Sequence, residues 1–347
     1  NSRQTSGGET RGVRTPYGDR PHGRQWTEWA RRAISRWKEW DEESRERQRP
    51  RVFFQTGDLI LRERHNSYTN DTISNWDALG VAYEVLTPSE VETRWPWIQY
   101  PDLGVALYEP DAGVVRSRRA IESVAQVFND AGGTIEQGLA TLGTRQGRRL
   151  DNITLRSGKT VSAGVFLFAC GPWFPKMFPE LMARRLRISM GHVFYFSIPP
   201  GDRRFVYPYM PSYGVPGCTG WPALPLDHRG FRVRTGGRPP ADPDTSDRWV
   251  APEYHERPRG ILRRHFPDLA DAVINETRAC HYESSVDRNF IIDTYPDLDN
   301  VWLIGGGSAE GFKFGPVLGE YIAHRVLNDD LEPHLAENFK LKSEQFE

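Results

Sequence analysis

Three consecutive glycines near the C-terminus make up the stretch of this sequence with the clearest chemical potential. Residues 301–304 are typical of a buried strand, residues 305–307 are all glycine, and a helix is expected over about 316–327. Glycines let a ligand approach the backbone closely, and a helix N-terminus favours anionic or electron-rich groups. The stretch either contacts a cofactor or simply packs a helix on a sheet. It is not a complete G-x-G-x-x-G fingerprint, because Glu310 stands at the sixth position.

Two side chains nearby carry chemistry in one interpretation and none in another. Lys313 lies between two phenylalanines, so it is either solvated along its stem or a cation that faces a carboxylate or a reduced flavin. Cys280 is either a small core residue or a nucleophile activated by Arg278 and His281. Neighbours along a strand point to opposite faces, so the adjacency of His281 is weak evidence for activation.

Other kinds of catalytic site are disfavoured by what the sequence lacks. The nine histidines include no His-x-His or His-x-x-x-His pair, and there is no Gly-x-Ser-x-Gly motif. Three scattered cysteines are too few for a disulfide framework or a zinc site. Metal catalysis and hydrolysis by a catalytic triad are therefore not expected.

Hydrophobic periodicity predicts the elements that position these groups. Residues 25–49 form an amphipathic helix ended by Pro50, with a tryptophan-rich stripe that we expect in the core. The apolar run 163–170 suits a strand buried on both faces of a parallel sheet, and the turn that follows it is a candidate ligand edge. Further helices are expected at 74–79, from 87 onward, at 118–131 and 252–266. Further strands are expected at 52–61 (in two halves), 83–86, 105–108, 134–136, 153–155, 161, 192–198, 230–234, 274–282 and 289–293.

Length and composition set the broad class of protein. The chain has 347 residues, which suggests two domains, and a net charge of −1, which argues against a generally basic nucleic-acid binder. No apolar run approaches the roughly 18 residues of a membrane helix. We therefore expect a cytoplasmic enzyme with no nucleic-acid or membrane partner.

Seven segments in order along the chain together resemble one family. The sequence is similar to the monomeric sarcosine oxidase-type FAD-dependent amine and amino-acid oxidases, within the D-amino-acid-oxidase-like superfamily. The resemblance rests on GETRGVR (8–14), TGDL (56–59), EPDAGV (109–114), ACGPW (169–173), CHY (280–282), FIID (290–293) and GGSAEGFKF (306–314).

The resemblance implies an α/β protein, α+β overall, in which a Rossmann-like FAD-binding domain carries an inserted antiparallel-sheet substrate domain. The FAD-binding domain would comprise residues 1–50, 109–185 and 287–347. The substrate-binding domain would comprise residues 51–108 and 186–286.

The resemblance also implies roles for individual residues. Arg14 and Lys313 fall on the cations that bind the substrate carboxylate, and Tyr282 falls on an aromatic that shapes the site. Cys280 falls on the cysteine that tethers FAD through the 8α carbon, and Arg11 on an arginine near the flavin ring. The remaining cofactor-binding positions would be Cys170, Gly171, Trp173, Gly306, Gly307, Gly311 and Phe312.

The sequence departs from the family pattern at several positions. The N-terminal strand and its glycine fingerprint would lie before residue 1, so we expect Asn1 to lie inside a longer protein. Gly236 and Thr219 stand near the places of an active-site histidine and tyrosine. Arg232 replaces the lysine that activates oxygen, and Glu310 replaces a histidine. Sarcosine itself is therefore not the expected substrate.

The expected reaction is oxidation of a secondary or N-substituted amino acid, or a related amine, by a monomeric enzyme. The resemblance implies hydride transfer to flavin N5, hydrolysis of the resulting imine, and reoxidation by O2 to give H2O2. Two alternatives stay open. The protein is a dehydrogenase that uses another electron acceptor, or it is a non-catalytic fragment or degenerate homologue.

Overall fold

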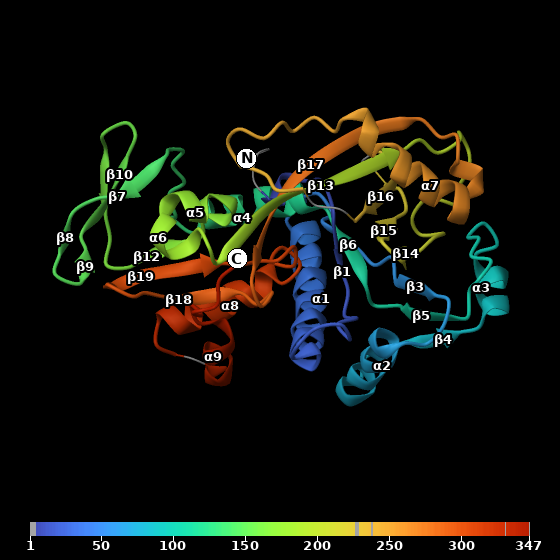
Figure 1. Cartoon of the computed structure of the whole chain (residues 1–347), viewed down its shortest axis with the longest axis horizontal. Helices are drawn as coiled ribbons and strands as arrows, with labels where there is room; N and C mark the ends of the chain where they lie inside the picture. Colours follow the sequence, from blue (N-terminus) through green and yellow to red (C-terminus); the bar gives the residue numbers. More distant parts are fainter. Residues whose placement is uncertain (1–4, 226–228, 237–238, 330, 347) are drawn as a thin grey trace.

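The largest unit of the computed structural model, which describes residues 5–225, 229–236, 239–329 and 331–346, is an eight-stranded sheet (Figure 1). Its order is β17-β13-β16-β15-β14-β3-β5-β4, and only β14 and β3 pair in parallel. The strands are β3 (Asp58–Arg62), β4 (Glu84–Leu86), β5 (Val105–Glu109), β13 (Leu186–Phe196), β14 (Ser212–Val215), β15 (Cys218–Trp221), β16 (Phe231–Thr235) and β17 (Ile274–Ser285). The predicted antiparallel sheet built from residues within 51–108 and 186–286 is confirmed, apart from the parallel pair β14 and β3.

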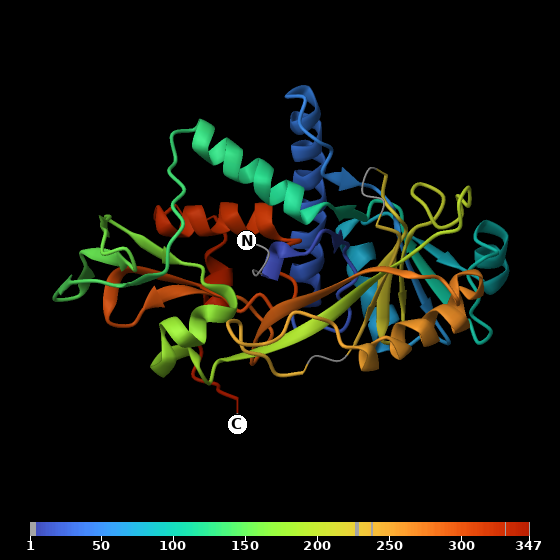
Figure 2. The same ribbon diagram turned by 90° about the horizontal axis from the view of Figure 1, so that it is seen from above.

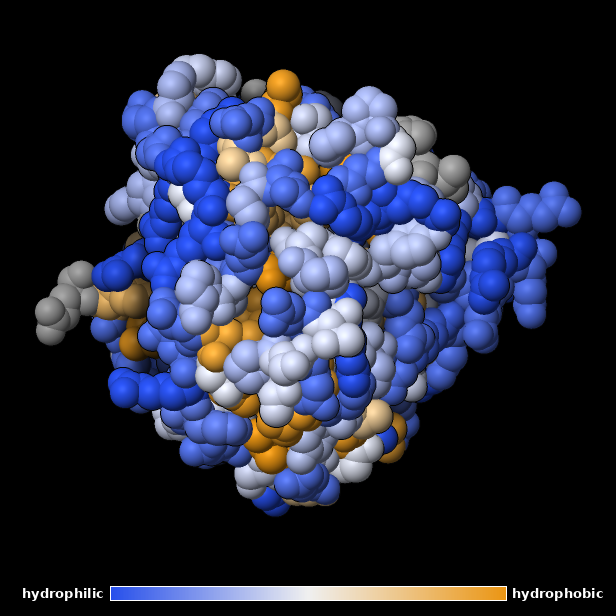
Figure 3. Space-filling view, turned by 90° about the vertical axis from the view of Figure 1, so that its right-hand side faces the viewer, coloured by the Kyte–Doolittle hydropathy of each residue, from blue (hydrophilic) through white to orange (hydrophobic). Residues whose placement is uncertain are grey.

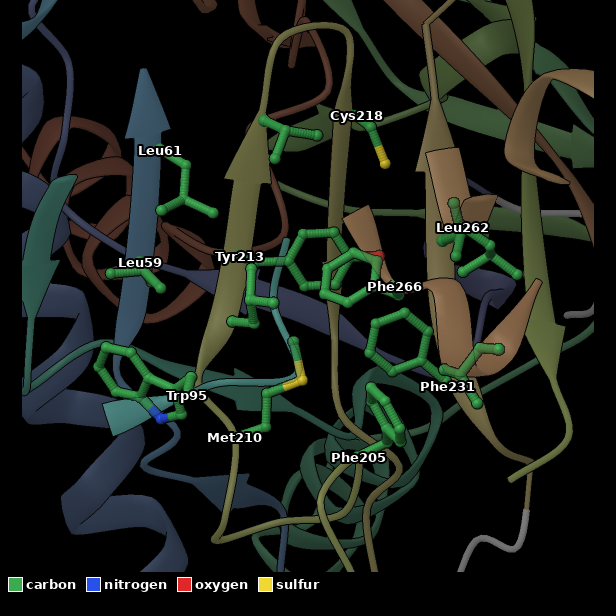
Figure 4. Close-up of a cluster of buried hydrophobic side chains, with 14 of the residues drawn as sticks. Leu59, Leu61, Trp95, Phe205, Met210, Tyr213, Cys218, Phe231, Leu262 and Phe266 are labelled. Atoms are coloured by element: carbon green, nitrogen blue, oxygen red, sulfur yellow. The ribbon is translucent and has the colours of Figure 1, made fainter. Parts of the chain in front are cut away.

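One face of this sheet is the main apolar core (Figure 4). Alternate side chains of β13, β14 and β16 point into it, and helix α7 (Glu256–His265) covers it. Tyr213 stacks on Phe231 with 5.3 Å between ring centroids, and Phe266 packs against both rings. Cys218 lies in this core, which makes it a packing residue. Figure 3 shows this end of the molecule from outside, where hydrophilic side chains cover most of the surface.

A smaller sheet of order β12-β19-β18 holds the glycine-rich stretch. β12 (Phe166–Phe168) runs parallel to β19 (Leu298–Gly305), and β18 (Ile291–Tyr295) pairs with β19 in the antiparallel sense. The predicted parallel pairing is confirmed, but the prediction that the run 163–170 is buried on both faces is wrong. Val165 and Leu167 are 41% and 48% exposed because alternate residues of this strand face outward.

Helix α1 (Gly23–Glu46) lies between the two sheets (Figures 1 and 2). Its tryptophan stripe packs in a second core with helix α8 (Gly315–Val326) and the small sheet β1-β6-β2, which confirms that prediction except that Trp40 is only half-buried. Trp37 stacks on Phe312, with 5.4 Å between ring centroids, and its Nε1 donates to the carbonyl of Lys313 at 2.9 Å. The strands of this small sheet are β1 (Arg11–Val13), β2 (Phe53–Phe54) and β6 (Gly113–Val115).

The remaining elements mostly follow the sequence prediction. α2 begins earlier than expected, because Asn66 caps it by accepting from the backbone N–H of Thr69. No strand forms at 134–136; instead β7 begins at Ala140 and pairs with β10. The other elements are α2 (Ser67–Leu79), α3 (Pro88–Arg94), α4 (Ser117–Asp130), α5 (Phe174–Met177), α6 (Pro179–Met182), α9 (Ala336–Phe339), β7 (Ala140–Leu142), β8 (Arg145–Gln146), β9 (Arg149–Leu150), β10 (Asn152–Leu155) and β11 (Thr160–Ser162).

Two kinds of feature are absent from the described residues. None of their helices is both long and apolar enough to cross a membrane. Nor do their His, Cys, Asp and Glu side chains form a group of three or more that would hold a metal ion.

Candidate active site

The glycine edge, which we define as residues 305–307 and 311, follows the carboxyl end of β19. Gly306 has a φ of 70°, and a Cβ there would lie 3.0 Å from the carbonyl oxygen of Asn289. At Gly305, Gly307 and Gly311 the nearest atom to an added Cβ is 3.6–3.7 Å away, which is an ordinary van der Waals contact, so a side chain there would meet no clash. The strand–glycine loop–helix predicted from the sequence is therefore present, and the carboxyl ends of β12 and β19 meet beside it.

Glu283, which sequence reasoning missed, lies directly against the glycine edge. Its Oε1 accepts from the N–H of Gly307 at 3.3 Å, while Oε2 is buried without a hydrogen-bond partner. Burial raises the pKa of Glu283 to about 7. Burial also raises the pKa of the nearby Cys170 thiol to about 11, with a further contribution from the Glu283 charge, so this thiol stays protonated. In the sequence Glu283 is one of several polar residues of a strand, and no glycine or motif beside it marked it.

Cys280 and Tyr282 lie on the face of β17 opposite to the face that carries Glu283, because alternate strand residues share a face. Cys280 is a buried free thiol paired across the sheet with Gly191. The Tyr282 ring covers Gly191 so closely that a Cβ on this glycine would lie 2.6 Å from it. The guanidinium of Arg234 lies 5.3 Å from the centre of the Tyr282 ring.

Arg232 lies on that same face, and two of its nitrogen atoms have no hydrogen-bond partner. Its guanidinium stacks 3.5 Å from the centre of the Trp221 ring, and its Nε and Nη1 are buried without a hydrogen-bond partner. Burial lowers the pKa of Arg232 to about 10. Its geometry therefore provides positive charge and two unused N–H donors.

β1 places Arg11 beside this face of the large sheet. Arg11 donates to the carbonyls of Thr10 and Thr5 at 2.8 and 2.6 Å. The Thr10 hydroxyl is hydrogen bonded to Tyr195 and accepts from Trp221, which joins β1 to two strands of the sheet. Trp173, predicted as a cofactor-binding residue, donates through Nε1 to Asp244 at 2.8 Å.

Arg14 and Lys313 line one pocket of about 380 Å³, which we call the charged pocket. The sequence prediction placed both cations on one substrate carboxylate, and the structure brings them to the walls of this pocket. The described residues that line it are Arg14, Pro16, Tyr17, Asp19, Arg20, Arg62, Tyr68, Arg288, Glu310 and Lys313.

Protein carboxylates already neutralise both of these cations. Asp58 lies 3.3 Å from Arg14, measured between Oδ1 and Nη1. Glu310 contacts Lys313 at 2.5 Å and Arg20 at 2.9 Å, and it accepts from the Tyr17 hydroxyl at 3.3 Å. Burial alone would raise the pKa of Glu310, but the charges of Lys313 and Arg20 lower it to about 2. Sequence reasoning noted Glu310 only as a departure and did not find Arg20 or Asp58.

An open glycine edge at parallel strand ends, joined to an antiparallel sheet with an anion-binding pocket between them, is the architecture of a flavoenzyme that acts on small polar molecules. The comparison with protein families makes this specific. Residues 2–325 match the family model described as FAD dependent oxidoreductase, and the chain belongs to this family.

Individual relatives agree with this assignment. The chain is 25% identical to monomeric sarcosine oxidase of Bacillus sp. (strain NS-129) over 337 residues, which cover 91% of this chain and 81% of the relative. It is 28% identical to N-methyl-L-tryptophan oxidase of Escherichia coli (strain K12) over 324 residues, with 91% and 82% covered. Its fold is similar to that of iminodiacetate oxidase from Chelativorans sp. BNC1, with a TM-score of 0.79, 20% identity, and 97% and 89% of the two chains covered.

The described residues fit the FAD that this family implies. The glycine edge has no side chains of its own that would hold a ligand away from its backbone. Glu283 Oε2 and the Nε and Nη1 atoms of Arg232 are buried polar atoms that lack partners, as expected where a large polar ligand supplies them.

Proposed function

We propose that this protein oxidises a secondary or N-substituted amino acid, or a related amine, with O2 as the electron acceptor. The observation that carries the proposal is the charged pocket, in which Arg14 and Lys313 face a common space beside the glycine edge. Relatives named as sarcosine and N-methyl-L-tryptophan oxidases act on substrates of this class, which supports it.

FAD, when bound, supplies the two-electron acceptor for the C–H bond next to the amine nitrogen. Arg14 and Lys313 bind and orient the substrate carboxylate through charge-assisted hydrogen bonds. To do so, Lys313 exchanges part of its contact with Glu310 for the substrate, and Glu310 keeps its contact with Arg20. Tyr282 does not line the charged pocket and shapes the space beside Cys280, where its ring covers Gly191. Arg232 places a buried positive charge where negative charge develops on reduction.

We also propose that Cys280 tethers the cofactor. Its thiol is free and buried, and it shares a face of β17 with Tyr282 and of the sheet with Arg232. Acid precipitation of the holo-protein should give a yellow pellet, and Cys280→Ser should give a colourless pellet with yellow supernatant. A colourless pellet from the unaltered protein would refute the tether.

The division into domains belongs to the same proposal. β3–β5 share the large sheet with the strands of residues 186–285, whereas β12, β18 and β19 form a separate sheet. This supports an FAD-binding domain of residues 1–50, 109–185 and 287–347, and a substrate-binding domain of residues 51–108 and 186–286.

The oxidation itself is tested by mixing holo-protein anaerobically with a panel of N-methyl amino acids and following loss of the flavin absorbance. Bleaching by at least one of them, followed by peroxide formation when air is admitted, is the expected result. If no member of the panel bleaches the flavin, the proposed substrate class is wrong.

A second candidate differs only in the electron acceptor. Arg232 is stacked on Trp221 and holds its charge in a delocalised guanidinium, which differs from a compact ammonium at the same place. This observation favours a dehydrogenase that passes electrons to another acceptor. Bleaching by substrate without peroxide formation in air would select that alternative.

A further inference from the structure

Arg62 differs from the other cations of the charged pocket. Arg14, Arg20, Arg288 and Lys313 each lie within 4.0 Å of a carboxylate: Asp58, Glu310, Asp19 and Glu310, respectively. Within residues 5–225, 229–236, 239–329 and 331–346, no carboxylate forms an ion pair with Arg62. The pocket therefore contains one guanidinium whose charge the protein leaves unmatched.

The guanidinium of Arg62 is held in a fixed position. Arg62 ends β3, and its Nη1 donates to the carbonyls of Leu61 at 2.8 Å and of Gly214 at 3.0 Å. Its planar group also lies 5.1 Å from the centre of the Tyr68 ring. These contacts use Nη1 and one flat face, and among the described residues Nη2 has no hydrogen-bond partner. A guanidinium that is already oriented loses little rotamer freedom when a ligand binds.

The charges around the pocket point to the ligand that Arg62 would bind. Among the described residues, five cationic side chains line it against Asp19 and Glu310, with Asp58 behind Arg14, so two positive charges remain in excess. A protonated substrate amine raises this excess to three, and the α-carboxylate of the same amino acid returns it to two. A second anionic group on the substrate would lower the excess to one.

We propose that the substrate of this pocket is an N-substituted amino acid with an acidic side chain, whose second carboxylate is bound by Arg62. The inference rests on the proposed oxidation of N-substituted amino acids and names the substrate class more narrowly. Arg14 and Lys313 bind the α-carboxylate, and Arg62 binds the distal carboxylate through Nη2, while the Tyr68 ring supports the Arg62 guanidinium at the pocket wall. The Tyr68 hydroxyl remains a donor, because burial raises its pKa to about 12.

The test compares acids with their isosteric amides. N-methyl-L-aspartate and N-methyl-L-glutamate differ from N-methyl-L-asparagine and N-methyl-L-glutamine only in the distal charge. A hydrogen bond to a charged group contributes about 1.5–3 kcal/mol, so the kcat/KM of the preferred acid should exceed that of its amide by about 10-fold to 100-fold. Arg62→Gln should bring this ratio close to one by lowering the kcat/KM of the acid.

The matched control is Arg203→Gln, because Arg203 also stacks on a tyrosine, 4.3 Å from the centre of the Tyr209 ring, but does not line the pocket. Arg203→Gln should leave the acid-to-amide ratio unchanged. Arg62→Lys, which keeps the charge and some of the backbone contacts, should retain part of the ratio if Arg62→Gln proves too unstable. An acid-to-amide ratio near one in the unaltered holo-protein would overturn the inference. So would Arg62 variants that both keep the acid-to-amide ratio of the unaltered protein.

A binding measurement separates this inference from the proposed function. Succinate and its monoamide succinamate cannot be oxidised by this chemistry, and their dissociation constants are measured by calorimetry on the holo-protein. Succinate should bind about 10-fold more tightly than succinamate, and Arg62→Gln should abolish the difference. If none of the four N-methyl amino acids bleaches the flavin, the proposed oxidation fails for them, and the succinate pair alone decides on Arg62.

Discussion

The charged pocket and the glycine edge each hold a buried glutamate, and the two carboxyl groups are in opposite states. Glu310 in the pocket contacts Lys313, Arg20 and Tyr17, and its pKa is about 2. Glu283 at the glycine edge has one N–H donor and an unpartnered Oε2, and its pKa is about 7. One carboxyl group is stabilised as an anion by its own protein, and the other is not.

The difference separates two ways of preparing a binding site. In the charged pocket the protein supplies counter-charges, so a substrate must exchange partners with Glu310 and can leave again when the pair re-forms. At the glycine edge and at Arg232 the protein leaves polar atoms unpaired, which costs about 1–3 kcal/mol for each unsatisfied group until a ligand supplies the partner. The first arrangement suits a molecule that turns over, and the second suits a cofactor that stays bound.

The largest expected effect comes from removing the pocket's central cation. Lys313→Met should lower kcat/KM by about 10³-fold, because it removes one of the two charges that orient the substrate. Steady-state peroxide assays measure the loss. Lys38→Met, which removes a surface lysine paired with Asp111, serves as the control and should keep full activity. Activity of Lys313→Met within threefold of the unaltered protein would show that this pocket is not where substrate binds.

The next largest effect is expected from replacing Arg232, whose Nε and Nη1 have no hydrogen-bond partner. Arg232→Met should slow reoxidation of the reduced flavin by O2 about 10²-fold and change reduction by substrate less than about threefold. Stopped-flow measurement of the two half-reactions distinguishes them, and Arg232→Lys should restore most of the oxygen reaction. If both half-reactions fall together, Arg232 maintains the structure of the sheet instead of acting on the acceptor.

The two glutamates should give opposite pH dependences of stability. Glu310 has a folded pKa below its ordinary value, so its contribution is present above about pH 4.5 and is lost as the pH falls toward 2. Glu283 has a folded pKa above its ordinary value, so stability falls as the pH rises from about 4.5 through about 7.

Glu310→Gln should therefore destabilise the protein at pH 7, and Glu283→Gln should stabilise it at pH 8, each by about 2 kcal/mol. Urea unfolding of the cofactor-free protein between pH 4 and 8 measures both. If both variants change the free energy of unfolding in the same direction, the contrast between the charged pocket and the glycine edge does not exist.

The smallest effect probes the support behind Lys313. Trp37→Phe keeps an aromatic ring against Phe312 and removes the hydrogen bond from Nε1 to the carbonyl of Lys313. It should cost about 1 kcal/mol of stability and raise the KM about twofold to threefold, with kcat unchanged. A fall in kcat without a change in KM would contradict a supporting role in substrate binding.

Local patterns in the sequence predicted the parts of the molecule that depend on neighbours along the chain. The apolar run of β19 is followed by glycines and then by a helical pattern. Few local structures other than strand, turn and helix fit this order. The tryptophan stripe of α1 likewise has to be buried. By contrast, Leu167 is exposed because it lies on the outward face of β12, and hydrophobic periodicity alone cannot tell which faces of a strand are covered.

In the candidate site, too, contacts between distant segments could not be predicted from the sequence. Arg14 and Lys313 could be paired through a family resemblance, but their counter-ions could not. Asp58 faces Arg14, and Glu310 faces Arg20, through contacts between segments that the fold alone brings together, and the second pair lies 290 positions apart. Glu310 is only three residues from Lys313, but its neighbours in the sequence did not identify it as the counter-ion of that lysine. In the sequence Glu283 cannot be distinguished from the other polar residues of its strand. Only the structure, in which it accepts from the N–H of Gly307, identifies it as a buried acid.

The contact between α1 and the loop that carries Lys313 has an optical consequence. An indole that donates a hydrogen bond to the carbonyl of a substrate-binding residue changes its emission when that residue moves. Trp37 therefore makes the occupancy of the charged pocket visible in fluorescence, even for ligands that leave the flavin spectrum unchanged. Subtracting the signal of Trp37→Phe isolates this reporter from the other ten tryptophans of the chain.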